Sequence, residues 1–138
     1  MSEPQADDLD FALQAVSQAR KAFALQLKGA GHFGRGEPHT LFIGVSENAP
    51  LRELAADCER AARRCGLEPE TSKYTPHVTL ARLRRRPGLG RLAAFEQRHA
   101  LFTSEPWQVD RFGLYASQVR RPAPSLYTLE AEYPLAVA

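Results

Sequence analysis

Segments with the apolar spacing of helices alternate along this chain with segments that have the spacing of strands. Apolar residues recur every three or four positions over residues 9–23, 51–65 and, for a shorter length, 89–99, which predicts three amphipathic helices. Strand-like segments lie at residues 23–28, 40–45, 74–83, 107–119 and 125–133. The connections between these elements are short, and helices and strands are mixed. This order predicts an α+β fold with a mainly antiparallel sheet.

The composition is that of one globular domain. The 138 residues are 43% hydrophobic and 25% charged, and no apolar run approaches the ~20 residues that a membrane-spanning helix needs. The N-terminal stretch MSEPQADDLD is acidic and lacks the apolar segment of a secretory signal. We therefore expect a cytoplasmic protein.

The two cysteines, Cys58 and Cys65, lie seven positions apart in the second expected helix. That spacing separates them by about 10.5 Å along the helix axis, which is too far for a disulfide. The paired Cys and His spacings of zinc sites are also absent from the sequence. We expect no metal and no other cofactor.

One short stretch, PHVTLA at 76–81, carries groups suited to phosphate chemistry. Alternate side chains of a strand share a face, so His77 and Thr79 should line an open groove while Val78 and Leu80 are buried. An imidazole that titrates near neutral pH and a neighbouring hydroxyl could act on a phosphate without a metal. A His-x-Thr tripeptide by itself is more often structural.

A similar stretch, PHTL, occurs at 38–41. In it His39 and Thr40 are adjacent, so on a strand they should project to opposite faces. We therefore expect that this pair does not form a second His/Thr surface, and that the likeness of the two stretches is a coincidence.

Five stretches taken together resemble the two-histidine phosphoesterase superfamily, in its RNA 2',3'-cyclic phosphodiesterase (2'-5' RNA ligase) branch. In chain order they are GHFGRGEPHTLFIGV, LRELAADCERAARRCGL, YTPHVTLARL, FGLYASQV and LYTLEAEYPL. The resemblance covers nearly the whole chain, and PHVTLAR matches the second His-x-Thr motif of that family. It implies a bilobal α+β fold over residues 1–138, with two such motifs facing each other across a cleft.

The resemblance also implies that the first His-x-Thr motif lies upstream of Met1. In the family a helix and a strand separate that motif from the strand matching LFIGV, and residues 9–28 supply that helix and strand here. The missing part would be roughly 30 to 45 residues by ordinary element and loop lengths. We then expect an exposed strand edge or apolar surface, through which the chain could self-associate.

In the family, one histidine is the general base for the attacking water and the other is the general acid for the departing ribose oxygen. By motif position His77 takes the base role and Thr79 binds phosphate, while no residue of this chain takes the acid role. The implied partner is RNA or a nucleotide with a 2',3'-cyclic phosphate or a 2'-5' linkage. A non-catalytic RNA- or nucleotide-binding remnant of the fold, and an unrelated α+β interaction domain, are the alternatives.

Further candidates for substrate binding each have a structural alternative. Arg82 matches the family motif as a phosphate contact, but simple alternation places it on the Val78 face unless the strand ends or bulges first. The run LRRRP at 83–87 could attract RNA or form a solvated turn. Phe33, which follows His32 in the glycine-rich loop expected at 29–38, could stack on a base, line the cleft or plug the core.

Three residues of the C-terminal strands also match family positions near the cleft. They are Tyr115, Ser117 and Tyr127. Tyrosines on strands are commonly packing residues, so a structural role is the alternative for the two tyrosines.

Overall fold

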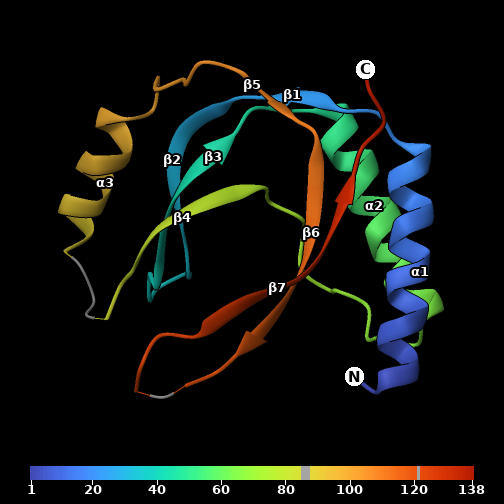
Figure 1. Cartoon of the computed structure of the whole chain (residues 1–138). Coiled ribbons are helices and arrows are strands. Elements are labelled where there is room, and N and C mark those ends of the chain that lie inside the picture. Colours follow the sequence, from blue (N-terminus) through green and yellow to red (C-terminus); the bar gives the residue numbers. More distant parts are fainter. Residues whose placement is uncertain (85–87, 121) are drawn as a thin grey trace. The chain divides into compact units, whose positions relative to one another are not determined.

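The computed structural model describes residues 1–84, 88–120 and 122–138 (Figure 1). These residues form three α helices and seven β strands. The β2–β3, β3–β4 and β6–β7 pairs are antiparallel, which confirms the α+β class. The chain divides into two compact units. The α1–α2 unit comprises Met1–Phe23, Ala49–Thr71 and Gln108–Ala138, and the α3 unit comprises Ala24–Asn48 and Ser72–Trp107.

The α1–α2 unit consists of two helices and a β hairpin. Its elements are α1 (Glu3–Ala19), α2 (Ala49–Arg64), β6 (Arg111–Gln118) and β7 (Leu126–Pro134). The two helices pack against each other, and α1 also contacts β7 (Figure 1). α1 begins with a capping box, in which the Ser2 hydroxyl accepts the Gln5 N–H and the Gln5 side chain accepts the Ser2 N–H. Such reciprocal bonds satisfy donors that the first turn leaves free.

Apolar residues of both helices form the core of this unit. The buried side chains include Leu9, Leu13 and Val16 of α1, Leu54 and Ala61 of α2, and Tyr133 of β7. Their spacing on α1 is the helical spacing expected from the sequence. None of the described helices is long and apolar enough to cross a membrane.

Polar contacts join the elements of this unit. Arg20, just after α1, donates to the Asp57 carboxylate of α2 through Nε at 2.6 Å and Nη2 at 3.2 Å, and to Glu53 at 3.0 Å. The guanidinium of Arg20 lowers the pKa of Asp57. The Tyr133 hydroxyl donates to Asp10 Oδ1 at 2.7 Å. Burial, followed by the contact with Asp10, raises the pKa of Tyr133.

The α3 unit contains a three-stranded antiparallel sheet with the order β2-β3-β4. The sheet consists of β2 (Leu27–Phe33), β3 (Thr40–Val45) and β4 (His77–Arg82), and α3 (Leu89–Arg98) packs against β2. The short strands β1 (Phe23–Leu25) and β5 (Trp107–Val109) pair with each other in a separate two-stranded sheet. Because β3 is central, β4 is an edge strand.

The expectation of a glycine-rich loop at 29–38 is wrong for its first half, which belongs to β2. Gly29 has φ +70° at a bulge, where the register of β2 against β3 shifts. Gly31 lies opposite Phe42, and a Cβ on Gly31 would come within 2.7 Å of the Phe42 ring. Glycines in a strand often mark a bulge or a close approach. Here Gly29 allows a bulge and Gly31 a close approach within β2, so His32 and Phe33 are strand residues and not loop residues.

Candidate active site

The register of the sheet brings six side chains to one face of the α3 unit. In an antiparallel pair, directly opposed residues project to the same side. β3 opposes Gly44 to His77, Phe42 to Thr79 and Thr40 to Arg82, and β2 opposes Phe33 to Thr40. We call this side the His77 face. Its members are Phe33, Thr40, Phe42, His77, Thr79 and Arg82.

A β-bulge in β4 explains how Arg82 reaches this face. Ala81 opposes Leu41 and Thr79 opposes Phe42, so Leu80 is an extra residue without its own partner on β3. One extra residue reverses the alternation of side chains beyond it. Arg82 therefore shares the face of Thr79. Of the alternatives that the sequence allowed for Arg82, the bulge is the one present. Bulges are frequent at sheet edges and beside active sites.

The expected burial of Val78 and Leu80 is wrong. Val78 opposes Ile43 on the face away from His77, but it is 47% exposed and Leu80 is 50% exposed. β4 is at one edge of the sheet, whereas α3 packs at the other edge, on β2. β4 is therefore an edge strand, and all six of its residues are exposed.

His77 is an exposed strand residue with a defined orientation. Its Nδ1 lies 2.7 Å from the backbone carbonyl oxygen of Thr75. A carbonyl can only accept, so Nδ1 carries the proton and Nε2 has the free lone pair in the neutral ring. The imidazole meets Phe33 edge to face, with centroids 4.8 Å apart, and lies 5.4 Å from the Phe42 ring. The ring is thus positioned by one hydrogen bond and two aromatic neighbours.

Arg82 and His39 share one hydroxyl group. Arg82 Nη1 donates to Thr40 Oγ1 at 3.2 Å, and His39 Nδ1 lies 2.8 Å from the same oxygen. The expectation that His39 and Thr40 point apart is wrong. β3 begins at Thr40, so His39 precedes the strand and the alternation of strand side chains does not apply to it.

Phe33 belongs to the aromatic cluster beside His77, with its ring 4.5 Å from that of Phe42. It is partly exposed, so it does not plug the core. The neighbouring His32 opposes Leu41 on the other face of the sheet, and its Nδ1 is hydrogen-bonded to the Glu96 carboxylate of α3. Of the two, only Phe33 lies on the His77 face.

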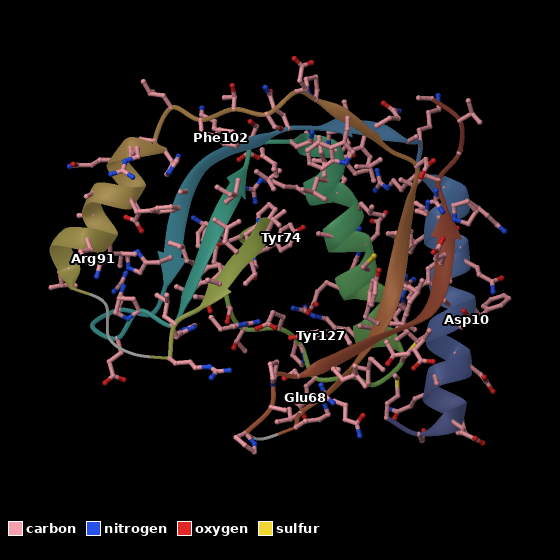
Figure 2. The ribbon with its side chains drawn as sticks, turned by 60° about the vertical axis from the view of Figure 1, so that its left-hand side comes forward. Asp10, Glu68, Tyr74, Arg91, Phe102 and Tyr127 are labelled. Carbon is pink, nitrogen blue, oxygen red and sulfur yellow. The ribbon has the colours of Figure 1, made fainter. Side chains whose placement is uncertain are left out.

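The three C-terminal candidates lie in the α1–α2 unit, apart in the chain from His77, Thr79, Arg82 and Phe33. Ser117 opposes Tyr127, and Tyr115 opposes Leu129 two residues along. These side chains therefore share one face of the β6–β7 hairpin, and all are exposed; Tyr127 is labelled on β7 in Figure 2. Tyr115, Ser117 and Tyr127 are therefore neighbours on the hairpin.

Charge is distributed unequally between the two units. The sequence of the α3 unit has nine Lys and Arg against four Asp and Glu, a net charge of +5, whereas that of the α1–α2 unit has nine against twelve, a net charge of −3. The cations of the α3 unit include Arg91 on α3 (Figure 2). Within the LRRRP run, Arg84 is exposed and residues 85–87 lie outside the described residues. The unit that carries His77 therefore suits an anionic ligand.

Three contributors to the site were not predicted from the sequence: the Thr40 hydroxyl, the Phe42 ring and the Thr75 carbonyl oxygen. Only the alternation within TLFIGV could have placed Thr40 and Phe42 on one face, and nothing in the sequence relates that face to His77. In the described part of the chain, no group of three or more His, Cys, Asp and Glu side chains is arranged to hold a metal.

Residues 1–121 of this α+β chain match the family model described as the 2'-5' RNA ligase superfamily. The chain belongs to this superfamily. It is 35% identical over 86 residues to an RNA 2',3'-cyclic phosphodiesterase of Aeropyrum pernix and 37% identical over 87 residues to one of Aquifex aeolicus. The matches cover 61% of this chain, but only 48% and 46% of those proteins.

Solved structures share the fold. A Thermus thermophilus protein aligns with a TM-score of 0.71 and 21% identity over 99% of this chain and 73% of its own. Escherichia coli LigT, solved in complex with 3'-AMP, aligns with a TM-score of 0.70 and 23% identity over 98% of this chain and 71% of its own.

Proposed function

We propose that this chain carries the general-base half of an RNA 2',3'-cyclic phosphodiesterase, which hydrolyses a 2',3'-cyclic phosphate to a 2'-phosphomonoester. The names of the similar proteins from Aeropyrum pernix and Aquifex aeolicus support this substrate class. So does the net charge of the α3 unit, since RNA is a polyanion. The substrate is RNA or a nucleotide with a cyclic phosphate end or a 2'-5' linkage, met in the cytoplasm.

The common orientation of His77, Thr79 and Arg82 on one sheet face carries this proposal. With Nδ1–H donated to the Thr75 carbonyl, the Nε2 lone pair of His77 takes a proton from water as the water oxygen bonds to phosphorus. The bond from phosphorus to the ribose 3' oxygen breaks, and that oxygen takes a proton from a general acid that is not among the assigned residues. The Thr79 hydroxyl and the Arg82 guanidinium donate to the phosphate oxygens.

Further candidates for substrate binding lie in each unit taken by itself. In the α3 unit, Phe33 contributes to binding through its edge-to-face contact with the His77 ring. On the β6–β7 hairpin, Tyr115, Ser117 and Tyr127 offer ring faces and a hydroxyl of the kind that RNA-binding proteins commonly use for bases and ribose. The free edge of β4 is a surface for self-association, because an unpaired strand edge presents backbone donors and acceptors to a second chain.

The test uses an oligoribonucleotide that ends in a 2',3'-cyclic phosphate. The wild-type chain should bind it and hydrolyse it slowly, and His77→Ala should lower the hydrolysis rate by ~10²- to 10⁴-fold, the usual effect of losing one positioned base. Thr79→Ala should weaken binding as well as rate, because a hydroxyl that grips phosphate acts in ground and transition states alike. Thr128→Val, on the face of β7 away from Tyr127, is the control and should leave both unchanged.

Undiminished turnover in His77→Ala, or loss of turnover with EDTA, would reject the mechanism. Binding without any turnover in the wild-type chain would favour the non-catalytic RNA- or nucleotide-binding alternative.

A further inference from the structure

We propose that Thr40, together with His39, is a positioning residue that holds the Arg82 guanidinium toward the phosphate on the His77 face. This inference rests on the proposed function, because it gives Arg82 a phosphate to bind. It concerns the PHTL stretch, which the sequence suggested was a coincidental copy of the catalytic motif.

Burial makes the Thr40 hydroxyl a fixed point. Thr40 is only 2% exposed, although it lies on the same face as the exposed Arg82. Its oxygen accepts from Arg82 Nη1 at 3.2 Å. A neutral His39 ring can then accept the hydroxyl proton through Nδ1, at 2.8 Å. A hydroxyl has one proton and two lone pairs, so both contacts can be satisfied at once.

The buried Thr40 hydroxyl does not need the hydrogen bond with Arg82, because it is already hydrogen-bonded to His39 Nδ1. The effect of the Arg82–Thr40 bond falls on Arg82 instead. The guanidinium has five N–H donors in a rigid plane, and one bond to Thr40 leaves four of them for an anion. No carboxylate pairs with Arg82 among the contacts of the described residues. An exposed arginine anchored at one nitrogen loses less conformational freedom when it binds phosphate.

The experiment compares Thr40→Val, which keeps the shape but removes the hydroxyl, with Thr40→Ser, which keeps the hydroxyl. Binding of adenosine 2'-monophosphate is measured by calorimetry. Loss of one anchoring hydrogen bond should weaken the affinity of Thr40→Val by about three- to tenfold, and Thr40→Ser should recover most of it. With the cyclic phosphate substrate, KM should rise in Thr40→Val while kcat changes little, since Thr40 does not touch the reacting atoms.

Further variants separate positioning from general damage to the fold. In an Arg82→Gln background, Thr40→Val should cause no additional loss of affinity, because Thr40 acts through Arg82. His39→Asn, whose Oδ1 can replace the Nδ1 acceptor, should bind better than His39→Leu. Nitrogen-15 NMR of the Arg82 side chain should show faster guanidinium rotation in Thr40→Val than in the wild-type chain, without any ligand.

Equal losses of affinity in the wild-type and Arg82→Gln backgrounds would overturn the inference, as would unchanged guanidinium rotation in Thr40→Val. If the wild-type chain binds neither the nucleotide nor the RNA, the proposed function fails. The NMR measurement still decides whether Thr40 restrains Arg82, so the two failures are distinguishable.

Discussion

The Phe33 ring should act on ligand binding through His77 and not by stacking on a base. The two rings meet edge to face at 80°, with centroids 4.8 Å apart, and Phe42 adds a second aromatic neighbour at 5.4 Å from His77. Phe33→Leu keeps an apolar side chain of similar volume and removes the ring edge. His77 then has one aromatic neighbour and the Thr75 carbonyl to hold it.

The expected size follows from the geometry. An aromatic pair in such an arrangement contributes ~0.5–1.5 kcal/mol beyond its buried area. Because His77 is exposed, we take no more than the middle of that range for the Phe33–His77 contact. Loss of this contact should therefore weaken ligand binding by about 1 kcal/mol, or roughly fivefold in Kd.

The assay is a double-mutant cycle on the affinity for adenosine 2'-monophosphate. It uses the wild-type chain, Phe33→Leu, His77→Ala and the double variant. If Phe33 acts through His77, the roughly fivefold loss should disappear in the His77→Ala background. Phe95→Leu is the matched control, because Phe95 packs on another histidine, His99, with centroids 4.6 Å apart, and no role in binding is proposed for it.

An additive cycle would refute this explanation. If Phe33→Leu weakens binding equally with and without the His77 ring, Phe33 contacts the ligand itself, as in base stacking.

Three further predictions concern stability and the bulge. Tyr133→Phe should lower the free energy of unfolding by about 1 kcal/mol in urea titrations, because it deletes the hydrogen bond to Asp10 at 2.7 Å; no change would show that water replaces this bond without cost. Burial raises the pKa of the Cys58 thiol from 9.0 to about 11. Between pH 9 and 11 the folded state keeps a proton that the unfolded state loses, so this contribution to stability is fully present below pH 9 and is lost as the pH rises through about 11. Urea titrations at pH 8 to 11 give the free energy of unfolding as a function of pH. Cys58→Ala should make that free energy fall less steeply above pH 9, and an unchanged fall would show that other groups cause it. Deletion of Leu80 should regularise β4 and keep Arg82 opposite Thr40, so nucleotide affinity should be retained; an affinity as low as that of Arg82→Gln would contradict the bulge as described.

The sequence by itself located the helices and identified the superfamily. Helical spacing located α1 and α2, because an amphipathic face is a local property of the chain. Alternation within PHVTLA correctly placed Val78 on the side away from His77, and the block order identified the family. These features depend on residues a few positions apart, which a single sequence displays directly.

Tertiary structure alone decided which residues are buried and which share the site. The burial of Val78 depends on what packs on an edge strand, and α3 packs on β2 instead. The bulge at Leu80 depends on the register between β3 and β4, and the contact from Arg82 to Thr40 joins residues 42 positions apart. Such pairings are set by backbone hydrogen bonds between distant strands, and one shifted bond reverses every side chain beyond it. The period of a strand predicts its two faces, but only the neighbouring strand determines where that period is interrupted.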